Sequence, residues 1–162
     1  MSPSGDMPDA QAQQESFSLA NMVPQAGLLN RGLWAGIESA VRDLATREGE
    51  IFVVTGPAFQ GQRLRSIGPN AVLVPTSVWK AVYDPEVNGA AAYMCTNTQK
   101  PRCNPVSVAA LTRVVGIDPF PALTDAVKRI AMKLPPPAPS RYNTRSNVRR
   151  TRGGAGSASN IQ

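Results

Sequence analysis

Four short apolar segments, each followed by turn residues, most constrain what this chain can fold into. They lie at 51–55, 71–75, 78–83 and 90–95. Short β-branched or aromatic runs that end in Gly, Pro, Asn or Asp are typical of buried strands. The fourth run is the least distinctive of the set, because its alanines also suit a helix. Short connections such as 84–89 favour antiparallel neighbours, so we expect a mostly antiparallel sheet.

Helices are predicted before and after this strand region in the sequence. Before it, the apolar residues recur at steps of three and four, at Leu29, Leu33, Ile37, Val41 and Leu44. That spacing places them on one face of a helix over about 29–47, with Gly49 as its stop. After the strands, Ser107 can cap a helix over 108–115, and a last helix is expected from 122 to 133. Helices added to an antiparallel sheet make an α+β fold.

The charge distribution divides the chain into two parts. Of its 17 Lys and Arg residues, five lie in 135–162, a segment without any acidic residue. We therefore expect a nearly neutral folded domain over 1–134 and a disordered, Pro/Arg/Gly/Ser-rich basic tail over 135–162. The tail can contact a phosphate backbone or act only as a solubilising end, and the sequence leaves both open. Residues 1–16 are polar and predict a disordered leader or a long loop.

The composition excludes several kinds of chemistry. The chain contains no histidine and two cysteines. It therefore offers no His general base, no Ser-His-Asp triad and no zinc site that needs imidazole. We expect no membrane partner, because no apolar stretch is long enough to cross a bilayer. The first six residues also lack the basic and apolar regions of a secretion signal.

One helical line of residues carries groups that suit phosphate chemistry. Asn30, Trp34, Glu38 and Arg42 follow one another at steps of four, so they lie on one side of the predicted helix. An amide oxygen and a carboxylate are ligands that suit Mg²⁺, and a guanidinium suits a phosphate. The spacing alone favours an ordinary surface line in which Glu38 and Arg42 form an i,i+4 pair.

Two neighbouring motifs resemble a known family. Asn21–Gln25 reads NMVPQ and Leu29–Glu38 reads LNRGLWAGIE. Together they resemble the metal-binding helix of the DNA/RNA non-specific endonucleases, the ββα-metal nucleases that include endonuclease G. The resemblance covers about 1–134 and continues through 50–57, 74–80, 106–108 and 116–123. It implies an N-terminally truncated ββα-metal (His-Me finger) fold and Mg²⁺-dependent cleavage of DNA and RNA.

The resemblance also implies roles for individual residues. Asn30 matches the asparagine that binds the Mg²⁺ directly, with Mn²⁺ as an alternative ion. Glu38 matches a carboxylate that orients metal-bound water. Asn21 matches a hydrogen-bonding support near the catalytic histidine, and Arg42 matches an arginine that contacts the substrate phosphate in some members.

The chain departs from the family pattern at its start. The family motif Asp-Arg-Gly-His supplies the general base, and Met1-Ser2-Pro3 matches the residues that directly follow it. We therefore expect the histidine and its strand to lie upstream of Met1, together with any signal for a secreted or periplasmic location. Two functions stay open: an endonuclease acting on DNA and RNA, or a non-catalytic nucleic-acid-binding remnant. The sequence does not set the oligomeric state.

The two cysteines allow two states. Cys95 and Cys103 are separated by a short polar segment. They can form a disulfide in an oxidising compartment, or they can stay as free thiols. No third ligand is near, which disfavours a metal site.

Overall fold

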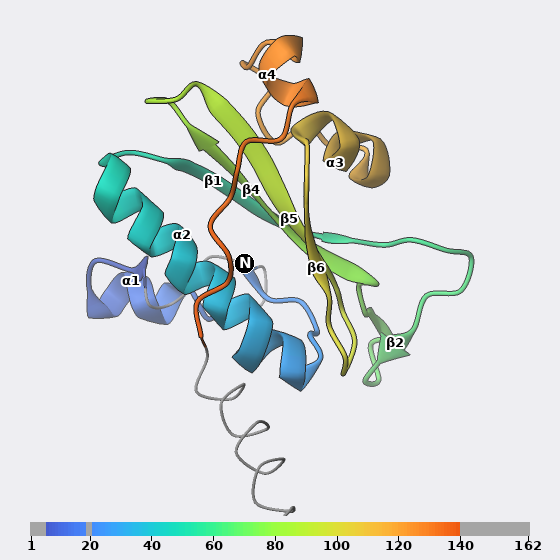
Figure 1. Ribbon diagram of the computed structural model, residues 1–162. Coiled ribbons are helices and arrows are strands. Elements are labelled where there is room, and N and C mark those ends of the chain that lie inside the picture. Colours follow the sequence, from blue (N-terminus) through green and yellow to red (C-terminus); the bar gives the residue numbers. More distant parts are fainter. Residues whose placement is uncertain (1–5, 19–20, 140–162) are drawn as a thin grey trace, which may run out of the picture.

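An antiparallel sheet with helices on both faces forms the centre of the fold (Figure 1). The computed structural model describes residues 6–18 and 21–139. The sheet has the strand order β1-β4-β5-β6, with bounds Phe52–Ala58, Ser77–Asp84, Gly89–Thr96 and Cys103–Val106. All three pairings are antiparallel, as expected for the sheet. The α+β class is therefore confirmed.

Alternation along β4 divides the core into two layers. Val78 and Val82 pack in the layer beneath helix α2, Ala35–Glu48. Trp79 and Ala81 point the other way and pack with residues of α3, Val108–Val115. Successive side chains of a strand point to opposite faces, so a strand that is buried on both faces reads as a continuous apolar run.

The helix predicted over 29–47 is present, but its first turns are wider than expected. Leu29–Trp34 form a π-helical segment, η3, which runs directly into α2. In a π turn the hydrogen bond spans one more residue than in an α-helix, so the inward-facing positions shift. Trp34 is therefore buried at 2% exposure, whereas Leu33 lies at the margin of the core.

Several elements differ from the sequence prediction. The strand expected at 71–75 shortens to β3, Val72–Leu73, which pairs with the unpredicted β2, Ser66–Ile67. Strand β6 was also missed. The region expected to be a disordered leader contains α1, Ala10–Glu15. Its cap explains the helix, because the Asp9 carboxylate accepts a 2.8 Å hydrogen bond from the backbone N–H of Ala12.

The two C-terminal helices end differently. Ser107 caps α3 and Gly116 ends it in a left-handed conformation, as predicted. Helix α4 covers only Asp125–Arg129 of the expected 122–133. The residues that follow are extended because they bond to the sheet: Ala131 bridges Ala90, and the Met132 N–H donates to the Ala90 carbonyl.

Residues 131–138 form an extended segment across the α2 face, here called the C-terminal strap (Figure 1). The Tyr93 hydroxyl donates a 2.5 Å hydrogen bond to the Pro135 carbonyl. The Ala138 N–H donates to the Gly36 carbonyl at 2.9 Å, and the Ala138 carbonyl lies so close to Gly36 that a Cβ at this position would clash with it. The domain therefore continues past the expected boundary at 134. The expectation of disorder from 140 onward lies outside the described residues.

The structure settles the state of the cysteines and shows one open sheet edge. Cys95 and Cys103 face each other on β5 and β6 and form a disulfide. Strand β1 pairs with β4 alone within the described residues, and Phe52 and Val53 on it are 48% and 40% exposed. No helix of the described part is long and apolar enough to cross a membrane.

Candidate metal and phosphate site

The loop that leads into the candidate site is held by one asparagine. Asn97, which follows β5, accepts a 2.7 Å hydrogen bond from the Ala26 N–H. Its amide nitrogen donates to the carbonyls of Pro24 and Pro75, at 2.9 and 2.8 Å. These bonds fix the approach to the helix before its first turn, where the exposed Asn30 donates its backbone N–H to Ala26 at 2.9 Å.

Asn30 lies on the π-helical segment and projects into solvent. Within residues 6–18 and 21–139, no hydrogen bond engages its carboxamide. Wide π turns interrupt α-helices often at functional positions, because they re-aim a side chain. The carboxamide oxygen of Asn30 is therefore available to a ligand.

Glu38 lies two turns further along the same helix, half-buried against the sheet. Burial raises the pKa of its carboxyl above the ordinary value. The Lys80 ammonium and a hydrogen bond from the Trp34 indole act in the opposite direction, as does the more distant Arg42 guanidinium. The carboxylate therefore has an indole donor and lies within the electrostatic influence of a buried cation.

That cation is Lys80, which is 2% exposed at the centre of β4. Its ammonium donates to the Thr55 hydroxyl at 3.0 Å and lies 5.4 Å from the centroid of the Trp34 ring. Burial lowers the pKa of Lys80, while the negative charges of Glu38 and Asp6 raise it. A buried ammonium with a hydroxyl, an aromatic face and a carboxylate around it is a satisfied charge rather than an orphan.

Arg42 is ion-paired with a residue far away in the sequence. Its guanidinium bonds Asp6 at 2.5 Å through Nη2 and at 2.8 Å through Nε. Both side chains are more than a third exposed, so the pair is worth little and can exchange for another anion. The guanidinium of Arg42 is therefore held only by an exposed ion pair in this structure.

Asn21 supports the loop upstream of the helix. Its amide nitrogen donates a 2.8 Å hydrogen bond to the Ser16 carbonyl, which ties the end of α1 to this loop. Nearby, the Nε2 atom of Gln25 is buried without a hydrogen-bond partner among the described residues. The structure places Asn21 in a supporting position and draws no contact between it and Asn30.

Sequence reasoning missed two members of this cluster, Lys80 and Asp6. Lys80 does leave a signal, because it is the one charged residue in the apolar run 78–83. A lysine inside a strand that is buried on both faces needs a partner. Asp6 leaves none, since only the three-dimensional fold brings it to Arg42.

The donor set fits a divalent cation of one kind and not of another. Within the described residues, no three His, Cys, Asp or Glu side chains gather at one point, which does not fit a fully protein-ligated ion. One carboxamide oxygen and one carboxylate do fit Mg²⁺, which keeps several of its waters and takes oxygen ligands. The residues therefore fit a largely hydrated ion held by Asn30.

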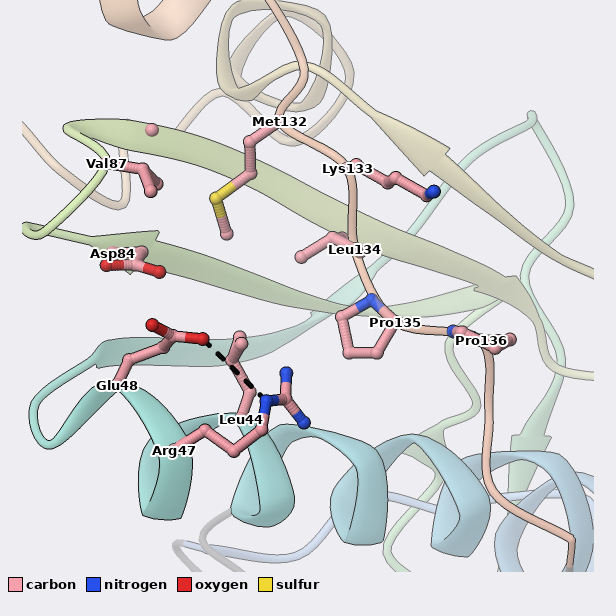
Figure 2. Close-up of a pocket in the computed structure, with 11 residues that line it drawn as sticks. Leu44, Arg47, Glu48, Asp84, Val87, Met132, Lys133, Leu134, Pro135 and Pro136 are labelled. Atoms are coloured by element: carbon pink, nitrogen blue, oxygen red, sulfur yellow. Dashed lines mark ion pairs between the residues drawn. The ribbon is translucent and has the colours of Figure 1, made fainter.

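A separate pocket lies at the other end of α2. It measures about 550 Å³ and lies between the end of that helix, the β4–β5 turn and the C-terminal strap (Figure 2). Arg47 and Glu48 form an ion pair of 3.8 Å on one wall, and Met132 and Leu134 form the other. The pocket contains none of Asn21, Asn30, Glu38 or Arg42.

The fold and this cluster together define an α+β protein in which an asparagine and a glutamate lie on one helix beside an antiparallel sheet. Residues 1–126 match the DNA/RNA non-specific endonuclease family, and the chain belongs to it. A solved structure titled as the EndoG/EndoGI complex and the mechanism of EndoG inhibition superposes with a TM-score of 0.64. It is 26% identical and covers 72% of this chain and 55% of that one, which confirms the ββα-metal fold.

Curated relatives extend the comparison. The mitochondrial nuclease EXOG of Danio rerio is 32% identical over 143 residues, which make up 76% of this chain and 42% of that protein. A salivary endonuclease of Lutzomyia longipalpis is 32% identical over 68% of this chain and 30% of its own length. A nuclease of Serratia marcescens is 33% identical over 47% of this chain and 31% of its own. The chain thus spans less than half the length of these relatives.

Proposed function

We propose that this chain carries the metal-binding half of a Mg²⁺-dependent endonuclease that hydrolyses phosphodiester bonds of DNA and RNA. The observation that carries the proposal is the helix that presents the free carboxamide of Asn30 and, two turns on, the supported carboxylate of Glu38. Family membership supports the substrate class, because the family is one of DNA/RNA nucleases.

The chain's own residues divide the work. Asn30 would hold the cation through its amide oxygen, with Mg²⁺ as the expected ion and Mn²⁺ as an alternative. When bound, the ion supplies a Lewis acid for a phosphate oxygen. Glu38, whose carboxylate form is favoured by Lys80 and the Trp34 indole against the effect of burial, would orient water at the site.

Two further residues have proposed roles: Arg42 in binding the substrate and Asn21 in supporting the loop. Arg42 would bind a substrate phosphate, and this contact requires Asp6 to be displaced from its guanidinium. The exchange costs little because both side chains are exposed. Asn21 would hold the loop in place through its bond to Ser16.

A second candidate function is a non-catalytic nucleic-acid-binding module. The observation in its favour is the absence of histidine from the 162 residues. General-base catalysis contributes roughly 10²–10⁴-fold, so a site without the base would bind and not cut. In the first function the base comes from an Asp-Arg-Gly-His segment that is not among these residues.

A secreted or periplasmic location is also part of the proposal. The Cys95–Cys103 disulfide supports it, because disulfides persist in oxidising compartments. Among the relatives, one is named as salivary and another as mitochondrial, so the family members are not confined to one compartment.

The experiment compares the given chain with a chain that carries an Asp-Arg-Gly-His segment and its upstream strands before Met1. Plasmid and RNA nicking is measured with Mg²⁺ and with EDTA. We expect EDTA-sensitive cutting by the longer chain, little by the given chain, and loss of most cutting in the longer Asn30→Ala variant. The matched control is the longer chain with alanine in place of the added histidine.

A binding measurement gives a readout that is independent of cutting. Titration of the given chain with Mn²⁺, followed by paramagnetic broadening of NMR signals, should place the ion at Asn30, and Asn30→Ala should abolish the effect. Strong EDTA-sensitive cutting by the given chain would show that the histidine is dispensable. Full activity of the longer Asn30→Ala variant would disprove Asn30 as the metal ligand.

A further inference from the structure

The connection between β1 and β4 forms an arm that stands away from the domain. Residues 59–73, here called the ribbon arm, end in the β2–β3 ribbon, which projects beyond the sheet and the helices (Figure 1). Its side chains Ile67, Val72 and Leu73 are 46%, 49% and 49% exposed. Apolar side chains that gather on a projecting element, and not in a core, are typical of an interaction surface.

The charge of the ribbon arm indicates the kind of partner. No Asp or Glu occurs between residues 51 and 83, so Arg63 and Arg65 are the only charged groups of the arm. Both are exposed, on either side of the half-buried Leu64. Neither forms an ion pair with any described residue. Two free guanidinium groups on an acid-free arm favour a polyanion, because their positive charge is not neutralised locally.

The root of the ribbon arm is fixed to the loop that precedes the metal site. The Thr76 N–H donates to the Ala58 carbonyl at 3.0 Å, which closes the root. Next to it, Asn97 bonds both Pro75 at the root and Pro24 in the loop before Asn30. The arm and the first turn of the metal-binding helix therefore lie at the same end of the molecule.

We propose that the ribbon arm is a second nucleic-acid contact of this protein, in which Arg63 and Arg65 bind backbone phosphates of a strand held at the metal site. The inference rests on the proposed function and adds a surface to it. The apolar side chains of the ribbon lie against sugars and bases, which are the apolar parts of a nucleic acid. A basic protein surface is disfavoured as the partner because the arm carries no acidic group to pair with it.

The test measures the affinity of the full chain for a short DNA duplex in EDTA, which separates binding from cleavage. The variant R63Q/R65Q is compared with R113Q/R129Q, which removes two exposed arginines from α3 and α4 and changes the net charge equally. Loss of two phosphate contacts should lower the slope of log K against log salt by ~1–2 and the affinity by about tenfold. The control should change the affinity less than about twofold, and R63K/R65K should retain most of it.

The outcomes separate this inference from the proposed function. Equal losses in both double variants, or wild-type affinity in R63Q/R65Q, overturn the role of the ribbon arm and leave the metal site untouched. A wild-type chain that does not bind the duplex at low salt overturns the inference, while the Mn²⁺ titration still decides the metal site. Light scattering tests whether a second copy of the chain binds the ribbon instead. The inference is overturned if the wild type is a dimer, I67S/L73S dissociates it, and the variant still binds DNA like the wild type. The ribbon would then be an interface between copies.

Discussion

Lys80 is the residue on which the chemistry of the cluster depends most. It brings a positive charge into the layer between sheet and helix, beside the Glu38 carboxylate and the Trp34 ring. Burial makes each charge unfavourable alone, and their mutual attraction offsets part of that effect. Two predictions follow from the opposed effects on these groups.

The first concerns the pH dependence of stability in Glu38→Gln. The pKa of Glu38 is raised by burial, so the folded state holds its proton to a higher pH than the unfolded chain does. Stability from this group is complete below its unfolded pKa and is lost as pH rises through the folded value. The stability of the variant relative to the wild type should therefore increase from pH ~4 to ~7. Urea unfolding across that range checks it, and a pH-independent difference would contradict it.

The second concerns Lys80→Met. Loss of the ammonium removes the main charge that opposes burial at Glu38, so the pKa of that carboxyl should rise further. Side-chain carbon NMR titration of Glu38 measures the change. Lys80→Arg, which keeps the charge, is the matched control. In a double-mutant cycle, Glu38→Gln and Lys80→Met should destabilise less together than the sum of the single changes, since neither charge is then left alone.

At the scale of elements, the C-terminal strap is ordered at 135–138, where the composition predicts the start of a disordered tail. The strap holds Pro135 and Ala138 on the α2 face through Tyr93 and Gly36. Burial raises the pKa of Tyr93 to about 12, so its hydroxyl stays a donor at neutral pH.

Truncation tests the strap directly. Removal of residues 135–162 should lower the free energy of unfolding by ~1–3 kcal/mol, because two hydrogen bonds are lost and Tyr93 loses its acceptor. Removal of 140–162 alone should leave it unchanged. The matched point variant is Tyr93→Phe, with an expected loss of ~1 kcal/mol. Identical melting curves for the two truncations would show that the strap does not contribute.

The disulfide between β5 and β6 gives another prediction for an element. The two cysteines are separated by 8 positions in the sequence. The loss of chain entropy in the unfolded state on closing such a loop predicts ~2–3 kcal/mol of stabilisation. Cys95→Ser with Cys103→Ser should lower the free energy of unfolding by that amount. A reducing agent should have the same effect on the wild type and none on the double variant. A reductant effect on the double variant would mean that another process is being measured.

The sequence predicts those elements whose signal is local. The stripe from Leu29 to Leu44, the Ser107 cap and the Gly116 stop act within a few residues, and the corresponding helices are found. The π turn at Asn30 could not be predicted, because it shifts which helix positions face inward without changing the residue composition. The pairs Arg42–Asp6 and Tyr93–Pro135 also leave no pattern, since they connect segments 36 and 42 residues apart. The family motif indicated the candidate residues, and their partners came from the fold.

At the scale of the whole molecule, the open edge of β1 governs solution behaviour. Exposed Phe52 and Val53 beside unpaired backbone groups can pair with another chain. Val53→Lys should reduce concentration-dependent aggregation, measured by dynamic light scattering, without loss of thermal stability. Val87→Lys, at a turn residue that is 66% exposed, adds the same charge and should have a smaller effect. Equal effects would mean that net charge, not the edge, controls association.

The strap also sets how the protein responds to a mechanical load. Its hydrogen bonds follow one another along the chain, from Ala138 on the helix to Pro135 on β5 and Met132 at Ala90. A force applied to the C-terminal end of the strap therefore loads these hydrogen bonds one at a time, and they break in sequence. Each step needs little force, and the strap yields before the sheet is sheared. Attachment to a surface through this end would expose the α2 face first, whereas attachment elsewhere would leave it covered.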